Sequence, residues 1–115
     1  MIVFRVQDND GRGPFKPGFS SVWVEPRDDH DNLPPWYYEF GRVDKSAIAG
    51  MTIGSACTSE DQLKRWFTES EYKKLLSFRY KSVKLEASVL AESDVQCFVQ
   101  RSKPFNKDFI EFDLY

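Results

Sequence analysis

The stretch SEDQLKRWFTESEYKKLLS, residues 59–77, decides the fold that the sequence predicts. The pairs Ser59–Gln62 and Thr68–Glu71 both have the three-residue spacing of helix-capping side chains. An apolar stripe at helical spacing follows each cap, formed by Leu63, Trp66 and Phe67 and then by Tyr72, Leu75 and Leu76. We therefore expect two short consecutive helices, or one kinked helix, whose large rings belong to the core.

Segments with the alternation of β-strands flank this helical stretch. The strands that we expect cover residues 2–6, 19–24, 51–53, 80–89 and 94–101, and a weak helix is expected at 45–49. In residues 80–89 the odd-numbered positions form the buried face and the even-numbered positions the wet face. Residues 109–115 also alternate, and they either close the sheet as a last strand or form a docking tail. The sequence predicts an α+β domain over residues 1–115, with a small mixed or antiparallel sheet of roughly four to six strands packed on the helices.

Composition and charge narrow the function classes. The chain has 115 residues, of which 16% are aromatic, so large rings can fill one compact core. Its net charge is −2 with both signs interspersed, which disfavours direct nucleic-acid binding because such binders carry a basic stripe. The N-terminal run MIVF is too short for a signal peptide or a membrane span. We expect a cytoplasmic protein with no membrane partner.

Two cysteines and one histidine leave little room for disulfide or metal chemistry. Cys57 and Cys97 do not form the framework of a secreted protein, so two free thiols are expected, with Cys97 as a small buried residue. The only histidine, His30, lies among acids and prolines without metal-ligand spacing. We expect no metal site.

Three placements could carry a ligand or a reaction, and each has an ordinary structural alternative. Arg5, on the first strand, could grip a phosphate or carboxylate through its planar guanidinium; alternatively it faces outward into solvent. Ser55, Thr58 and Ser59 stand at a strand-to-helix junction, where hydroxyls hold ligands or simply cap the helix. Glu92, Asp94 and Gln96 could act from a strand edge, or they are solvated turn residues.

An acidic segment with aromatic neighbours is the candidate partner surface. It contains Asp28, Asp29 and Asp31, followed by Trp36 and Tyr37. Acids steer association with a basic surface, and aromatic rings commonly anchor interfaces. The predicted partner is a host or phage protein with a basic surface, unless the two rings turn inward to the core.

The order of these candidates resembles the Arg…Ser/Thr…Glu layout of ADP-ribosyltransferases. Arg5, Ser55 or Thr58, and Glu92 or Gln96 stand at the corresponding places. The resemblance implies a site for nicotinamide adenine dinucleotide (NAD), with Arg5 and the late acid or amide holding the dinucleotide. A clear Ser-Thr-Ser run is missing, and glutamine at the acid position would impair transfer chemistry.

A second resemblance covers more of the chain. The runs FRVQDNDGRGPF, YYEFG, CTSEDQLKRWF and DVQCFVQ are similar to small accessory proteins of phages and prophages. That resemblance implies a protein that binds and blocks a host protein, such as a defence nuclease, and needs no cofactor. We expect a non-enzymatic binding protein, with the NAD-binding transferase as the alternative.

Overall fold

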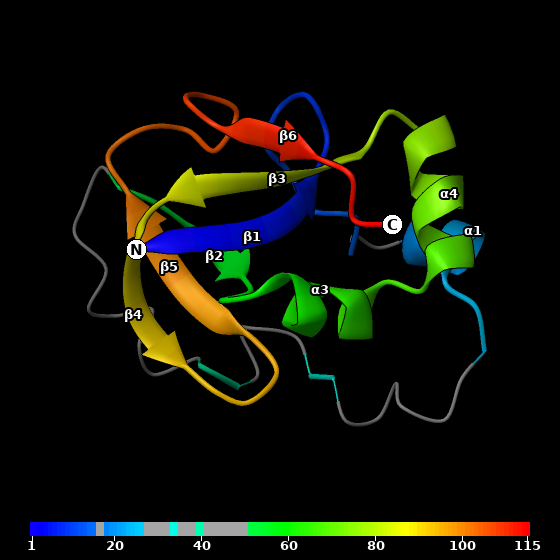
Figure 1. Cartoon of the computed structure of the whole chain (residues 1–115), viewed down its shortest axis with the longest axis horizontal. Coiled ribbons are helices and arrows are strands. Elements are labelled where there is room, and N and C mark those ends of the chain that lie inside the picture. The colour runs from blue at the N-terminus through cyan, green and yellow to red at the C-terminus, as the bar shows by residue number, and fades with distance from the viewer. Residues whose placement is uncertain (16–17, 27–32, 35–38, 41–50) are drawn as a thin grey trace.

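The computed structural model describes residues 1–15, 18–26, 33–34, 39–40 and 51–115 (Figure 1). Its elements, in chain order, are β1 (Ile2–Gln7), α1 (Ser20–Trp23), β2 (Thr52–Ala56), α3 (Glu60–Trp66), α4 (Glu69–Ser77), β3 (Lys81–Glu86), β4 (Ser88–Glu92), β5 (Cys97–Arg101) and β6 (Ile110–Phe112). These strands and short helices confirm the α+β class. The helix expected at residues 45–49 lies outside the described residues.

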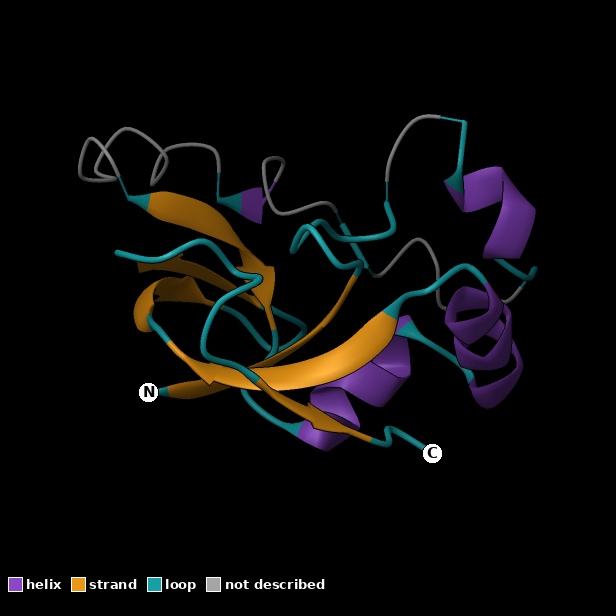
Figure 2. Cartoon of the chain, turned by 90° about the horizontal axis from the view of Figure 1, so that it is seen from above, coloured by secondary structure: helices purple, strands orange, loops and turns teal. Residues whose placement is uncertain are grey.

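The strands form two antiparallel three-stranded sheets, in the orders β1-β3-β6 and β2-β5-β4. The sheets are joined where the backbones of Phe4 and Cys57 exchange hydrogen bonds of 2.8 and 2.7 Å. They are joined again at Ala87, which connects β3 to β4. The N–H of Ala87 donates to the carbonyl of Met1 at 2.9 Å. The strands therefore gather in one part of the molecule, with α1 and α4 at the opposite end (Figure 2).

The single strand expected at residues 80–89 is divided between the two sheets. Its even-numbered face is not wet throughout, because Ser82 is fully buried. The Ser82 hydroxyl lies 2.6 Å from the Tyr72 hydroxyl and donates to the carbonyl of Phe112. Pairing with β6 covers this position. The C-terminal segment thus closes the first sheet as a strand.

Both faces of β5 are buried at its start, where Cys97, Phe98 and Val99 are each fully shielded from solvent. Cys97 and Val99 belong to a cluster of buried apolar side chains from both sheets, and Phe98, on the opposite face, stacks on Phe40 with ring centroids 6.4 Å apart. The expected strand at residues 94–101 starts three residues later than predicted, at Cys97. The residues before it form a turn in which Ser93 and Gln96 share a backbone hydrogen bond.

The prediction of a strand at residues 19–24 is wrong, because Ser20–Trp23 form the short helix α1. One helical turn places Phe19 and Trp23, four residues apart, on the same side of the chain. Phe19 stacks on Tyr80 with ring centroids 5.4 Å apart, and Trp23 is fully buried. The Trp23 indole N–H donates to the carbonyl of Pro14 at 3.2 Å. Burial of the two rings outweighs the strand propensity of the segment.

Both predicted helix starts are confirmed. Ser59 caps α3 by accepting a hydrogen bond from the N–H of Gln62 at 3.1 Å. Thr68 and Glu71 form a reciprocal capping box at the start of α4, with distances of 3.2 and 3.0 Å. The segment 59–77 therefore folds as two helices, and Phe67 is the residue at which the first one ends.

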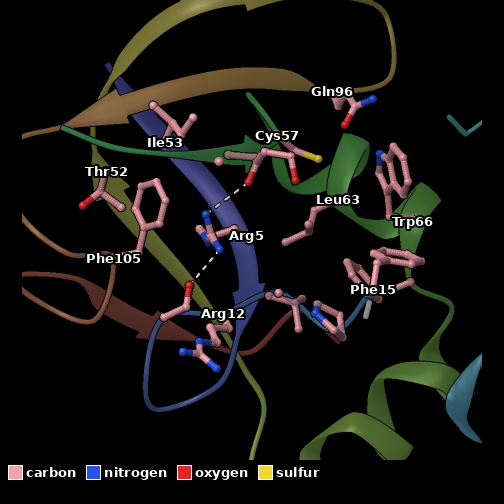
Figure 3. A pocket seen from close by; sticks show the side chains of 18 of the residues that line it. Arg5, Arg12, Phe15, Thr52, Ile53, Cys57, Leu63, Trp66, Gln96 and Phe105 are labelled. Atoms are coloured by element: carbon pink, nitrogen blue, oxygen red, sulfur yellow. Dashed lines mark hydrogen bonds between the residues drawn. The ribbon is translucent and has the colours of Figure 1, made fainter. Parts of the chain in front are cut away.

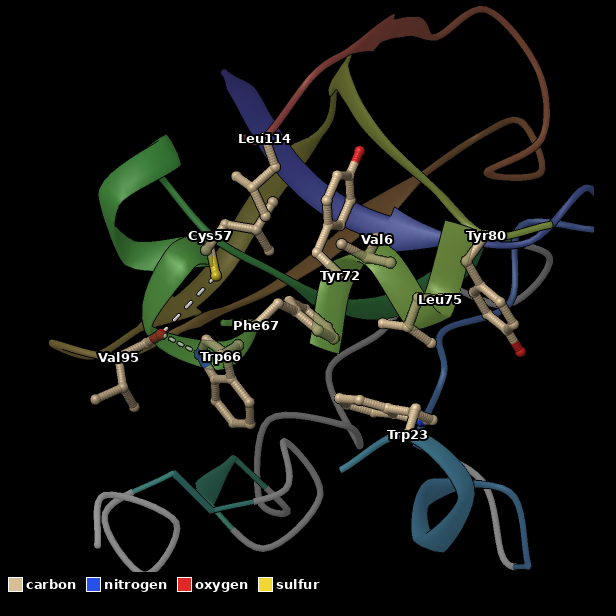
Figure 4. Packing of buried hydrophobic residues seen from close by; sticks show 11 residues of the cluster. Val6, Trp23, Cys57, Trp66, Phe67, Tyr72, Leu75, Tyr80, Val95 and Leu114 are labelled. Carbon is tan, nitrogen blue, oxygen red and sulfur yellow. Dashed lines mark hydrogen bonds between the residues drawn. The ribbon is translucent and has the colours of Figure 1, made fainter. Parts of the chain in front are cut away.

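Two clusters of buried apolar side chains hold these elements together. The first, between the two sheets, is called the intersheet core and consists of Val3, Ala56, Val83, Leu85, Ala87, Cys97, Val99 and Phe105. The second is called the helical core and consists of Val6, Trp23, Cys57, Leu63, Trp66, Phe67, Tyr72, Leu75, Tyr80, Val95 and Leu114 (Figure 4). Trp66 and Phe67 are 8% and 4% exposed, so their predicted place in the core is confirmed.

Candidate functional site

A cavity of about 530 Å³ lies beside β1 and β2. Its walls come from β1, the turn at residues 10–15, β2, the apolar side of α3, and the loop that carries Phe105. Figure 3 shows Arg5 at its centre, between Phe105 on one side and Leu63 and Trp66 on the other. The volume falls in the range of pockets that hold small ligands or a few side chains of a partner.

Strand alternation places Arg5 on a buried face. Side chains two residues apart in a strand share a face, so Arg5 lies on the same side of β1 as Val3 and Gln7. All three are buried, with Arg5 only 7% exposed and Gln7 fully shielded. The alternative of an outward-facing Arg5 is therefore wrong. An arginine occupies a position where an apolar core residue would otherwise be expected.

The guanidinium of Arg5 is held from several sides. Its Nη2 donates to the carbonyl of Gly11 at 2.9 Å, and its Nη1 donates to the carbonyl of Ser55 at 3.3 Å. The ring of Phe105 lies below it, with 4.1 Å between the ring centroid and Cζ. Two carbonyls and a stacked ring fix the orientation of the planar group.

The positive charge of Arg5 has no ion-pair partner in the part of the chain that the structure describes. Its Nε is buried there without a hydrogen-bond acceptor. Burial lowers the pKa of Arg5 to about 10, partly offset by the charge of Asp8, so the group stays protonated at neutral pH. A desolvated cation without a counter-ion is energetically costly, which makes it a candidate binding group.

Two glycines permit this packing. A Cβ on Gly54 would lie 2.9 Å from Cε2 of Phe105, closer than real Cβ contacts, and 3.0 Å from Nη1 of Arg5, tighter than most of them. Gly11 has a φ of +81°, which favours glycine, and its carbonyl is one of the two that hold Arg5. The arginine, the phenylalanine and both glycines therefore form one fitted unit.

The structure brings together some of the predicted site residues but not all. Arg5, Ser55 and Gln96 line the cavity, whereas Thr58 and Glu92 do not. Gln96 donates from Nε2 to the carbonyl of Pro34 at 2.7 Å and to a carboxylate oxygen of Glu39 at 2.9 Å.

Thr58 and Ser59 serve the start of α3. The backbone N–H of Thr58 donates to Oε1 of Gln62 at 2.8 Å, and Ser59 is the cap, as its structural alternative predicted. Glu92 is exposed at the end of β4. The Arg…Ser/Thr…Glu layout of the ADP-ribosyltransferases is not assembled around Arg5, so that resemblance is not supported.

The predicted partner-binding residues Asp28, Asp29, Asp31, Trp36 and Tyr37 all lie outside the described residues.

Both cysteines are free thiols, as predicted, and both are buried, which was predicted for Cys97 alone. Cys57 lines the cavity, and burial raises its pKa well above the ordinary value. Burial, reinforced by the charge of Glu92, raises the pKa of Cys97 to about 12. Thiols in this state are protonated and weakly nucleophilic.

Sequence reasoning missed the residues that complete the cavity, above all Phe105 and Gly54. Phe105 lies far along the chain from the arginine that it covers, in the loop between β5 and β6. The available signal was a lone phenylalanine within the polar turn run RSKPFNKD, residues 101–108. Such a ring is expected to pack against other apolar groups, but the sequence does not specify which groups these are.

Comparisons with known proteins identify a family. A family model described as "Bacteriophage T4 Y00F protein" matches residues 1–113. No curated protein and no solved structure matches the chain. Among the described residues, none of the helices has the length and apolar character needed to cross a membrane. Since the family match spans nearly the whole sequence, the chain belongs to the bacteriophage T4 Y00F protein family.

Proposed function

We propose that this phage protein acts by binding a host protein and modulating it, with the Arg5 cavity as its recognition site. The observation that carries the proposal is a buried, oriented arginine that has no ion-pair partner among the described residues and is set in a cavity with aromatic walls. Interfaces depend on a few buried aromatic and arginine anchors that fill pockets. A partner side chain that enters this cavity would meet both kinds of group.

The side chains around the cavity suit binding better than catalysis. A nucleophile has to be activated by an adjacent base or by a lowered pKa, and the pKa of Cys57 is raised. Gln96 uses its amide N–H groups on Pro34 and Glu39. The cation itself is held in place by backbone carbonyls. Such a site is organised to recognise a group rather than to transform it.

Exposed apolar side chains support a macromolecular partner. Val22, Leu76 and Phe78 are 52%, 47% and 46% exposed at the end of the molecule formed by α1 and α4. These two helices contact each other, and Phe78 also packs edge-to-face on Phe19 at 5.4 Å. Apolar side chains that are exposed at one end of a molecule are candidate contacts for a protein partner. The acidic residues Asp28, Asp29 and Asp31 are a proposed second contact, suited to a basic surface.

The test is capture followed by reconstitution. Tagged protein is used to capture partners from a lysate of the host bacterium, and each candidate is then purified and titrated against the untagged chain. We expect at least one candidate to bind directly and to lose affinity with Phe78→Ser. The matched control is Ile110→Ser, which removes an apolar side chain of 63% exposure on β6, a strand of the first sheet.

Failure of every purified candidate to bind would contradict the proposal. So would consumption of NAD by the wild-type protein in the presence of host proteins, because that result would indicate the enzymatic alternative. A triple substitution of Asp28, Asp29 and Asp31 by Asn tests the acidic segment separately. If that segment steers the partner, the variant associates more slowly and its association rate depends less on salt.

A further inference from the structure

The geometry of the Arg5 cavity points to its ligand: we infer that the cavity binds a carboxylate carried next to an apolar side chain, as in an acidic segment of a partner protein. This inference rests on the proposed function, because it names the chemical group by which the partner is recognised. Three properties of the described residues carry it: the unused donors of Arg5, the charge of the lining, and the character of the walls.

Arg5 has donors to spare. A guanidinium carries five N–H groups, and within the described chain Arg5 uses two of them, on the carbonyls of Gly11 and Ser55. Neither acceptor is charged, so the hydrogen bonds orient the group without neutralising it. An arginine that is already oriented binds a planar carboxylate with little further loss of side-chain freedom.

The lining favours a single negative charge. Among the described residues its charged side chains are Arg5, Asp10 and Arg12, of which Asp10 and Arg12 are exposed. Asp10 and Arg12 have opposite signs, and Asp8, which is not a lining residue, offsets the buried charge of Arg5 only in part. A carboxylate would neutralise that charge, whereas a phosphate dianion would bring an excess negative charge into a largely apolar cavity.

The walls favour an apolar group beside the charge. Phe105 covers one side of Arg5, while Leu63, Trp66 and Phe15 form the other side of the cavity (Figure 3). Phe15 is 53% exposed even though its ring lies 5.6 Å from that of Trp66. The volume of about 530 Å³ exceeds what a carboxylate alone would fill. A neighbouring apolar or aromatic side chain would occupy the remainder and cover these rings.

The first experiment uses wild-type protein and small probes. Phenylacetate and phenylacetamide have nearly the same shape but differ in charge, and inorganic phosphate supplies an anion without an apolar group. The reporter is the Nε–Hε signal of Arg5 in proton–nitrogen NMR spectra of labelled protein, assigned by its disappearance in Arg5→Lys.

We expect phenylacetate to shift the Arg5 signal with a dissociation constant on the order of 1 mM, typical of a ligand with about ten heavy atoms. Phenylacetamide and phosphate should bind at least about tenfold more weakly. Equal binding of the acid and the amide would overturn the inference, as would stronger binding of phosphate or absence of any shift up to about 10 mM phenylacetate.

The second experiment uses the reconstituted partner. Arg5→Met removes the charge, and Lys107→Gln removes a charge of the same sign from an exposed position that is not among the lining residues. We expect Arg5→Met to weaken partner binding by more than about tenfold and Lys107→Gln to change it less than about threefold. Folding of each variant is verified by its NMR spectrum.

The outcomes separate the inference from the proposed function. A partner that binds wild type and Arg5→Met equally well would refute the carboxylate site and leave the binding function standing. A selective response to phenylacetate without any captured partner would support the site and count against a host protein as its ligand. Should Arg5→Met fail to fold, the acid and amide probes on wild-type protein still decide the inference.

Discussion

The two faces of β1 illustrate two different uses of a buried position. On one face Val6 joins the helical core, where Trp23, Leu75 and their neighbours are closely packed (Figure 4). On the other face the apolar row that starts at Val3 continues as Arg5 and Gln7 beside an open cavity. One strand thus has an apolar face and a face on which two polar side chains are buried. The cavity opens around Arg5, and Val6, Leu63 and Trp66 of the helical core also line it.

The difference between the faces indicates where stability and recognition reside. Close-packed apolar groups stabilise a domain, whereas a desolvated cation and an unfilled cavity both reduce stability. Natural sequences tolerate such features mainly at sites that bind something. We therefore expect the helical core to supply the free energy of folding that offsets the cost of the buried charge of Arg5 and of the unfilled cavity.

The largest expected effect comes from emptying the helical core. Trp23→Ala removes a fully buried indole together with its hydrogen bond to Pro14, so the free energy of unfolding should fall by about 3 to 5 kcal/mol. Urea denaturation followed by circular dichroism measures the change. A loss below about 1 kcal/mol would show that α1 is not part of the stabilising core.

Adding a methyl group at Gly54, beside the cavity, should lower the free energy of unfolding by a smaller amount. In Gly54→Ala the new Cβ meets Phe105 and Arg5, so one of them has to shift, at about 1 to 3 kcal/mol of stability. The Arg5 Nε–Hε signal should move as well. Gly13→Ala is the control, because a Cβ there meets nothing within 4 Å, and it should change stability by less than about 0.5 kcal/mol. Equal effects of the two substitutions would contradict the fitted unit around Arg5.

The attachment of α4 to the helical core provides the next test. The hydroxyl of Thr68 caps the helix, and Glu71 of the same capping box is fully buried and accepts the N–H of Glu25 at 2.8 Å. Thr68→Ala should therefore cost about 1 to 2 kcal/mol in thermal or urea unfolding. Thr68→Ser keeps a hydroxyl and should recover most of the loss. If serine and alanine are equally destabilising, the cap is not the source of the effect.

The contrast between the faces also explains how much the sequence could predict. Local rules sufficed for both helix caps and for most strands, because capping spacing and alternation act over a few residues. They failed at residues 19–24, where contacts of Phe19 and Trp23 with distant residues override strand propensity. They failed again at Ser82, whose burial depends on β6, about thirty positions later.

The candidate site shows the same limit. Alternation alone puts Arg5 on the face of Val3, but it does not tell whether that face is covered. The cover comes from Phe105 and from the carbonyls of Gly11 and Ser55, which lie far apart in the sequence. The choice of Arg5 as a candidate came from its residue type and position, and the cavity came only from the fold.

The smallest expected effect on stability belongs to the residue with the largest expected effect on binding. Arg5→Met removes the cost of burying a cation that has no ion-pair partner among the described residues, and it leaves a flexible apolar side chain of similar length. It also deprives the carbonyls of Gly11 and Ser55 of a donor, at roughly 1 kcal/mol each. Because these contributions have opposite signs, the free energy of unfolding should change by less than about 1 kcal/mol. Val6→Ala, one position along on the opposite face, is the matched control and should cost about 2 kcal/mol through lost apolar burial. Urea denaturation of the two variants beside wild type makes the comparison directly. If Arg5→Met is instead the more damaging substitution, by 2 kcal/mol or more, the arginine is a structural element of β1 and the two faces of the strand serve stability alike.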